Sequence, residues 1–168
     1  RIVVHPKDPD TVLVAAQGAL YSPSEERGVF KSADGGATWK KVLFVNDKTG
    51  AAELSMDATN PRILYAAMWQ HGRRPWQVIS GGPGSGLYKS TDTGETWQKM
   101  TEGLPKEMGK MAIAVSRSNP ETVCCSARNS RPPGRTRSPR TAACPPSNQR
   151  ASACSRWWMA MSMARWCR

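Results

Sequence analysis

Several residue types are missing from long parts of this 168-residue chain. Residues 1–123 contain no cysteine, no acidic residue follows Glu121, and no histidine follows His71. A cysteine-free stretch of this length fits a cytosolic or an exported bacterial protein equally well. The chain has no apolar run long enough to cross a bilayer, and it begins at Arg1 without a methionine or a signal peptide. We therefore expect it to be a piece of a longer protein that continues upstream.

The last 45 residues differ from the rest in composition. Residues 124–168 hold nine arginines, no lysine and no acid, and they account for most of the net charge of +11. An arginine-rich segment ordinarily suggests contact with nucleic acid or a membrane, and cysteines suggest disulfides or zinc. No C-x-x-C pair occurs, however, and the segment has no strand or helix period. We predict no nucleic-acid partner, no membrane insertion, no metal site and no cofactor. All five cysteines lie in this segment, at Cys124, Cys125, Cys144, Cys154 and Cys167.

A reading-frame error would explain this segment. The internal repeat described below predicts that Val123 is followed by residues like Tyr-Ala-Ala, yet Cys124 and Cys125 stand there. Reading the codons for Val-Cys-Cys-Ser one nucleotide later permits Val-Tyr-Ala-Val. We therefore favour an out-of-frame tail over 124–168. A disordered basic tail and a folded metal or disulfide module are the alternatives.

An eight-residue motif occurs twice in the first part of the chain. It reads SADGGATW over 32–39 and STDTGETW over 90–97, which is a spacing of 58 residues. A second element recurs in step with it, as HPKDPDTVLVAA over 5–16, MDATNPRILYAA over 56–67 and VSRSNPETV over 115–123. A fixed period of this kind indicates a repeat architecture, with a unit of about 50 to 60 residues.

Each unit is predicted to contain four β-strands. Residues 51–57 and 110–117 alternate apolar and polar side chains, which is typical of half-buried strands, and no segment has helical periodicity. Four short strands per unit are the pattern of a propeller blade, so the fold class predicted is an all-β partial β-propeller. The remaining predicted strands are 11–16, 28–32, 38–45, 62–69, 86–90 and 96–100. The predicted domains are blade 1 over about 1–45, blade 2 over about 51–101, the start of blade 3 over about 110–123, and the tail over 124–168.

The repeated motif is predicted to brace the turn between the third and fourth strands of a unit. Aspartates there accept hydrogen bonds from turn amides, glycines permit positive φ, and serines close the turn from the other side. The tryptophan that ends each copy is predicted to be buried between neighbouring sheets, where such a ring covers about 150–250 Å². The predicted structural positions are Ser32, Asp34, Gly36, Thr38, Trp39, Ser90, Asp92, Gly94, Thr96 and Trp97.

The S-x-D-x-G-x-T-W pattern resembles the Asp-box, or BNR repeat, of sialidases, some endoglucanases and sortilin-type receptor domains. Residues 25–51 with NPRILYAAMWQHGRRPW and SGGPGSGLYKSTDTGETW are similar to large bacterial proteins with a sortilin-like propeller, often described as glycosyl hydrolase BNR-repeat proteins. The resemblance covers residues 1 to about 123. It implies a many-bladed propeller and an exported protein, but no particular activity, because such blades occur in hydrolases and in binding proteins. Two units and part of a third do not close a ring, so we expect that the remaining blades are needed for closure.

The connection WQHGRRPWQVISGGPGSG holds the most site-like residues. Aromatic and cationic side chains on a propeller rim bind glycans or acidic peptides by stacking and charge. The simpler alternative, which the sequence favours, is a solvated insertion whose tryptophans cover the edge of the blade. No catalytic residue is predicted, since Glu25 and Glu26 are the only adjacent carboxylates and are expected to be exposed. The predicted rim residues are Trp69, His71, Arg73, Arg74 and Trp76.

Two functions remain open at this stage. The first is a noncatalytic binding or scaffold propeller for peptide or glycan, in the periplasm or outside the cell. The second is a piece of a secreted glycoside hydrolase, sialidase-like or glucanase-like, whose acid and base lie in other blades. Glycosidases use two carboxyl groups about 5–9.5 Å apart, and a pair at that separation would discriminate between the two.

Overall fold

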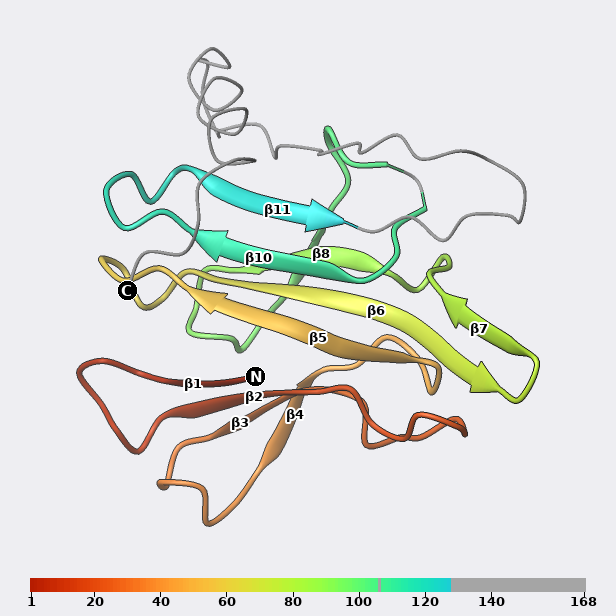
Figure 1. The fold of residues 1–168 in the computed structure, drawn as a ribbon. Coiled ribbons are helices and arrows are strands. Elements are labelled where there is room, and N and C mark those ends of the chain that lie inside the picture. The colour runs from red at the N-terminus through yellow and green to blue at the C-terminus, as the bar shows by residue number, and fades with distance from the viewer. Residues whose placement is uncertain (106, 128–168) are drawn as a thin grey trace, which may run out of the picture.

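The computed structural model describes residues 1–105 and 107–127. All regular elements in these ranges are β-strands, and every strand pairs antiparallel with its neighbours. The prediction of an all-β chain is therefore confirmed. Figure 1 shows three sheets stacked in chain order, with the N-terminal sheet at the bottom of the view.

The first sheet contains four strands in the order of the sequence. Leu13, Ala15 and Val29 point toward the second sheet and are buried. The β-branched and aliphatic residues of these short runs favour extended backbone with one buried face. The strands are β1 (Ile2–Val4), β2 (Val12–Ala16), β3 (Gly28–Ser32) and β4 (Lys40–Leu43).

The second sheet has five strands, one more than predicted. Strand β6 continues five residues past Trp69, and its far end pairs with an additional strand, residue His71 opposite Ser80 and Arg74 opposite Gln77. The charged and glycine residues of this end interrupt the apolar pattern, so the sequence suggested an irregular connection there. The strands are β5 (Thr49–Met56), β6 (Leu64–Arg74), β7 (Gln77–Ser80), β8 (Gly86–Ser90) and β9 (Gln98–Met100).

The third sheet contains two strands, β10 (Met111–Val115) and β11 (Val123–Ala127). Strand β11 continues past Val123 and pairs Cys124 with Ala114 and Cys125 with Ile113. The described structure therefore includes four residues of the segment that the sequence assigned to the tail. The prediction of an out-of-frame or disordered tail concerns mainly 128–168, which lie outside the described residues.

Strand β6 is buried on both faces because it lies in the middle of the stack. Leu64, Ala66 and Met68 belong to the core between the first and second sheets. Tyr65 and Ala67 belong to the core between the second and third sheets, together with Leu87, Met111 and Ile113 on neighbouring strands. Successive side chains of a strand point to opposite faces, so the unbroken apolar run LYAAM fits a strand covered on both sides.

The first box, which we define as Ser32–Trp39, is a hydrogen-bonded turn between β3 and β4. Ser32 Oγ donates to Asp34 Oδ1 at 2.6 Å and accepts from the Gly36 amide at 2.8 Å. Asp34 also accepts from the amide of Thr38 at 2.8 Å and from its hydroxyl. These hydrogen bonds link the serine, the aspartate and the threonine of the motif within one turn.

The second box, Ser90–Trp97, repeats this arrangement between β8 and β9. Ser90 Oγ donates to Asp92 Oδ1 at 2.7 Å and accepts from the Gly94 amide at 2.9 Å, and Asp92 accepts from the amide and hydroxyl of Thr96. The two boxes thus have the same internal hydrogen bonds.

The two tryptophans have different surroundings. Trp97 is half-buried, packs against the core between the first two sheets, and donates from Nε1 to the Gly94 carbonyl at 3.0 Å. Trp39 is 45% exposed. The predicted burial between sheets therefore does not hold for Trp39. Among the described residues, the first sheet packs against another sheet on only one side, and Trp39 is not on that side.

Candidate functional site

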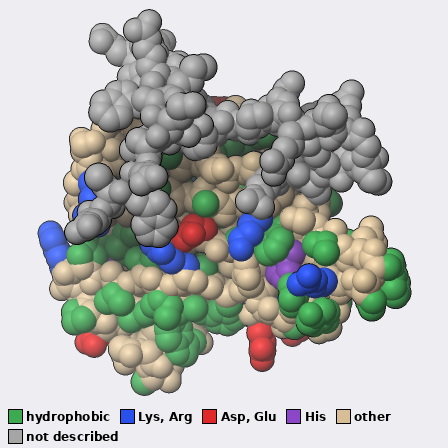
Figure 2. All heavy atoms as spheres, viewed as in Figure 1, with side chains coloured by type: hydrophobic (Ala, Val, Ile, Leu, Met, Phe, Trp, Pro, Cys, Tyr) green, Lys and Arg blue, Asp and Glu red, His purple; other side chains and the backbone are tan. Residues whose placement is uncertain are grey.

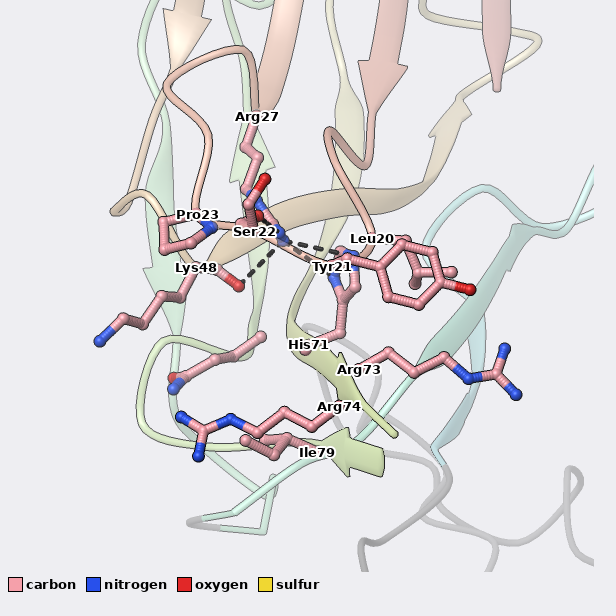
Figure 3. A pocket seen from close by; sticks show the side chains of 12 residues that line it. Leu20, Tyr21, Ser22, Pro23, Arg27, Lys48, His71, Arg73, Arg74 and Ile79 are labelled. Carbon is pink, nitrogen blue, oxygen red and sulfur yellow. Dashed lines mark hydrogen bonds between the residues drawn. The ribbon is translucent and has the colours of Figure 1, made fainter. Parts of the chain in front are cut away.

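Three segments meet at one end of the sheets. They are the connection after β2, the connection after β4, and the last residues of β6 together with β7. They enclose a cavity of about 140 Å³ between the first and second sheets, shown in Figure 3. The volume is several times what one ordered water needs. The cavity is lined by Leu20, Tyr21, Ser22, Pro23, Arg27, Lys48, Gln70, His71, Gly72, Arg73, Arg74 and Ile79.

Arg27 lies at the base of the cavity, and its side chain is fixed by backbone carbonyls. The residue is 1% exposed. Nη1 donates to the Lys48 carbonyl at 3.1 Å, and Nη2 donates to the carbonyls of Ser22, at 3.0 Å, and Ala19. Arg27 thereby ties the connection after β2 to the connection between β4 and β5. Its Nε is buried and has no hydrogen-bond partner.

Gly18 explains how the chain closes around this side chain. A Cβ atom at Gly18 would lie 2.4 Å from Arg27 Cγ, and the backbone there has a φ of +72°. Both the conformation and the space therefore require glycine at this position.

No carboxylate in the described part of the chain forms an ion pair with Arg27. Among these residues, one ion pair joins Arg1 to Glu53, and two others join Glu95 to Lys31 and to Lys40. Burial lowers the pKa of Arg27 from its ordinary value, and attraction to Asp47 opposes this shift. The guanidinium remains charged, because arginine is not deprotonated in proteins near neutral pH.

His71 joins Arg27 to an aromatic stack. Arg27 Nη1 lies 3.1 Å from Nδ1 of His71, and the imidazole stacks on Trp69 with ring centroids 4.4 Å apart. Lys110 Nζ, which comes from the start of the third sheet, lies 5.2 Å from the centroid of the Trp69 ring. The pKa of His71 is lowered by burial, with smaller contributions from the charges of Arg27 and Lys110, while the Trp69 carbonyl opposes the shift. A neutral imidazole can accept the hydrogen bond from Arg27.

The outer part of the cavity is basic and aromatic. Arg73 and Arg74 are exposed, and Figure 3 shows their side chains leaving β6 toward opposite sides. Tyr21 is 75% exposed on the facing connection of the first sheet. In Figure 2 hydrophobic and basic side chains lie next to each other over the end of β6 and β7.

The structure separates the five predicted rim residues into three groups. His71, Arg73 and Arg74 line the cavity, and Trp69 contacts His71 without lining the cavity. Trp76 lies in the turn between β6 and β7 and is 78% exposed. The segment is a β-hairpin whose residues 73–78 are exposed, so the solvated insertion that the sequence favoured consists here of two paired strands.

The sequence analysis did not identify Arg27, Tyr21 or Gln70. Arg27 immediately precedes Gly28, which has a φ of +122°, and the equivalent position in the second unit is Ser85 before Gly86. Aligning the two units places Arg27 where the second unit has the buried Ser85, and this difference is the sequence signal that points to Arg27. Gln70 accepts a hydrogen bond from the Gly84 amide at 2.9 Å, which depends on the fold and leaves no sequence pattern.

No carboxylate of the described residues lines the cavity. Glu25 and Glu26 are exposed and do not line the cavity. The carboxylates with a shifted pKa are all shifted downward, whereas a general acid at neutral pH needs a raised pKa. These are Asp34, Asp57, Asp92 and Glu95. Within 1–105 and 107–127 there is also no group of His, Cys, Asp or Glu side chains that could hold a metal ion.

Comparison with known proteins gives distant and partial similarities. No family model matches the chain. It is 28% identical over 106 residues to the vacuolar protein sorting/targeting protein 10 of Colletotrichum graminicola, and 28% identical over 114 residues to the xyloglucanase Xgh74A of Acetivibrio thermocellus. Each match covers 62% of this chain, but only 6% of the first relative and 12% of the second.

Among solved structures, an ancestral GH74 enzyme matches with a TM-score of 0.56 at 20% identity, over 75% of this chain and 16% of that chain. The fold is a partial β-propeller. At this identity the likeness concerns the fold alone. The chain spans a small part of the length of these three proteins. In the described part of the chain, no helix is long and apolar enough to cross a membrane.

Proposed function

We propose that this chain forms part of a noncatalytic carbohydrate-binding propeller, with the binding surface at the rim between the first and second sheets. The observation that carries the proposal is the β6–β7 hairpin, which presents Trp76 at 78% exposure beside a cavity flanked by Tyr21. Exposed aromatic rings of this kind stack on the apolar faces of sugar rings. The xyloglucanase name of one relative makes a β-glucan the first ligand to test.

Binding is favoured over catalysis by the chemistry of the acids. The described carboxylates with shifted pKa values are held in their charged forms by hydrogen bonds or lysines, and they belong to turns away from the cavity. A hydrolase needs one carboxyl group that keeps its proton near neutral pH. We find no such group around the cavity in the described part of the chain.

The alternative function is that of a section of a glycoside hydrolase whose catalytic carboxylates lie in other blades. It is favoured by the similarity to Xgh74A and to GH74 enzymes. Incubation of the longer protein that contains this chain with xyloglucan, followed by a reducing-sugar assay, separates the two, because the alternative places the catalytic carboxylates outside these residues. We expect polysaccharide retention without sugar release, and release above that of a heat-treated control would contradict the binding proposal.

Affinity electrophoresis in gels that contain xyloglucan or β-glucan tests binding directly. We expect the chain to be retarded, and the Trp76→Ala variant to lose most of the retardation, because removing one stacking ring costs about tenfold in affinity. Trp39→Ala is the matched control, since Trp39 is also exposed but lies in the first box, away from the cavity. Equal retardation of both variants and the unchanged chain would contradict the assignment of the hairpin as the binding surface.

The similarity to a xyloglucanase also supports a location in the periplasm or outside the cell, where polysaccharides are met. We propose this location together with a glycan partner. The remaining blades of a ring would then complete the rim that the β6–β7 hairpin begins.

A further inference from the structure

We propose that the cavity between the first and second sheets binds the carboxylate of an acidic sugar, a uronic acid, within the glycan. This inference rests on the proposed carbohydrate-binding function and adds the class of sugar. Its basis is a set of cationic side chains around the cavity without carboxylates in contact with them.

The first step concerns Arg27, which is a fixed positive charge beneath the cavity. It is 1% exposed and held by three carbonyls and His71, so it cannot turn toward solvent. Burying a charge without an opposite charge beside it destabilises the folded protein, so the binding of an anion close to that charge is favourable. The unpartnered Nε of Arg27 shows that the surrounding protein does not fully satisfy this side chain.

The second step concerns the walls, which add charge of the same sign. Arg73 and Arg74 line the cavity, both are exposed, and neither takes part in an ion pair among the described residues. Lys48 also lines the cavity, where its carbonyl holds Arg27, and the ammonium of Lys110 lies over the Trp69 ring. A guanidinium pairs with a carboxylate through two parallel hydrogen bonds, which makes arginine the preferred side chain for such groups.

The acids nearby do not neutralise these cations. Asp47 attracts Arg27 electrostatically but does not line the cavity, and its backbone carbonyl accepts a hydrogen bond from the Ser24 amide. Glu25 and Glu26 lie on the connection that forms one wall, yet they are exposed and outside the lining. The cavity therefore has a positive potential, and low-dielectric walls strengthen the attraction of a single anionic group.

The third step concerns size and neighbours. About 140 Å³ is room for one carboxylate and part of its ring, not for a polysaccharide chain. Tyr21 lines the cavity at 75% exposure, so a sugar ring whose carboxylate enters can stack on the phenol. The amide of Gln70 offers a further polar contact to a sugar hydroxyl.

The test compares digalacturonate with its dimethyl ester, which keeps the sugars and removes the charges. Isothermal titration with the full chain at about 0.15 M salt, where surface charges are screened, gives both affinities. We expect the acid to bind at least about tenfold more tightly than the ester. In the double variant Arg73→Gln/Arg74→Gln we expect most of this preference to be lost, because the exposed guanidinium partners are removed and only the charge of Arg27 remains.

The control variant is Arg62→Gln, an equally exposed arginine that precedes β6 at the end opposite β7. It should keep the full preference for the acid, which separates the cavity from attraction to the net charge of +11. All three replaced arginines are exposed, and circular dichroism will verify that each variant keeps its β-sheet signal.

The outcomes separate this inference from the proposed function. Equal binding of the acid and the ester to the unchanged chain, or an acid preference that is undiminished in the double variant, would overturn the carboxylate site and leave glycan binding in place. Absence of binding to these sugars and to the gel polysaccharides would overturn both. Binding of a diglutamate peptide as tight as that of digalacturonate would overturn the assignment to a sugar.

Discussion

The two boxes have the same sequence pattern and the same internal hydrogen bonds, but they lie in different surroundings. Gly94 of the second box is so close to the first sheet that a Cβ atom there would lie 2.7 Å from Leu13 Cδ2. Glu95 bonds to Lys31 at 2.7 Å and to Lys40 at 3.1 Å, both on the first sheet. The first box makes no such contact with a described sheet, and its Trp39 is exposed.

This difference separates two roles of the motif. The hydrogen bonds of Ser, Asp and Thr close within eight residues, so they form in either setting. Burial of the tryptophan and the ion pairs depend on a neighbouring sheet. We infer that the box is a local turn brace first, and a contact between sheets only where another sheet lies beside it.

The largest effect should come from the tryptophans. Trp97→Ala is expected to lower the free energy of unfolding by about 2 kcal/mol, less than the 3–5 kcal/mol of a fully buried tryptophan because Trp97 is half-buried. Trp39→Ala should cost less than about 0.5 kcal/mol, as at an exposed site. Urea unfolding of both variants measures the two values, and a Trp39 cost equal to that of Trp97 would remove the distinction between the boxes.

Asp34 and Asp92 should contribute alike to the loss of stability in acid, because the hydrogen bonds of each aspartate lie within its own box. Hydrogen bonds hold the pKa of Asp34 and of Asp92 far below the ordinary value of 3.8. Their stabilisation is therefore complete above about pH 4 and is lost as the pH falls from there toward the folded pKa. Urea unfolding between pH 6 and pH 2.5 should show this acid loss, and Asp34→Asn and Asp92→Asn should each reduce it by a similar amount. A reduction confined to one box would show that the networks are not equivalent.

Backbone conformation provides a smaller contrast. Thr93 in the second box has a φ of 61°, where the first box has Gly35 with a φ of 70°. Side chains with a branched Cβ are strained in this region. Thr93→Gly is therefore expected to stabilise the chain by up to about 1 kcal/mol, and Gly35→Thr to destabilise it by about 1–2 kcal/mol. Thermal unfolding compares them, and shifts of the same sign would contradict the conformations of the two turns.

The ion pairs should have the smallest effect. Glu95→Gln is expected to cost about 1 kcal/mol at low salt and less at 1 M salt, because the carboxylate of Glu95 and the ammonium of Lys40 are open to solvent while the Lys31 side chain is only 13% exposed. Ala37 holds the equivalent place in the first box, and Ala37→Glu should leave stability unchanged because it is exposed and no neighbouring described sheet supplies the lysines that Glu95 meets. A double-mutant cycle of Glu95 with Lys31 gives the coupling energy, and a cycle near zero would show that the second box does not depend on this contact.

The sequence was sufficient where structure is local and repeated. Most of the strands followed from alternation and from the repeat, as β10 and the turn at Asp92 show, but β1 was not among the predicted strands. Strand β7 was missed because its pairing with Arg73 and Arg74 carries no apolar pattern. The burial of Trp39 was predicted from the motif alone, although burial depends on what lies beside the sheet.

The candidate site was predicted only in part for a similar reason. His71, Arg73 and Arg74 lie on one segment whose composition is conspicuous. Arg27 meets Lys48 and His71 across separations of 21 and 44 residues, and a single sequence does not show which loops come together. Its position before a positive-φ glycine indicated a turn, not a buried charge.

Solvent access to the two box tryptophans tests the central claim most directly. The chain can be labelled with 5-fluorotryptophan, its resonances assigned with Trp39→Phe and Trp97→Phe, and the ¹⁹F lines broadened with a soluble neutral nitroxide. If the second box packs on the first sheet and the first box faces solvent, the Trp39 line will broaden several-fold more than the Trp97 line. Equal broadening of the two lines would contradict the stacked arrangement on which the cavity and both proposals depend.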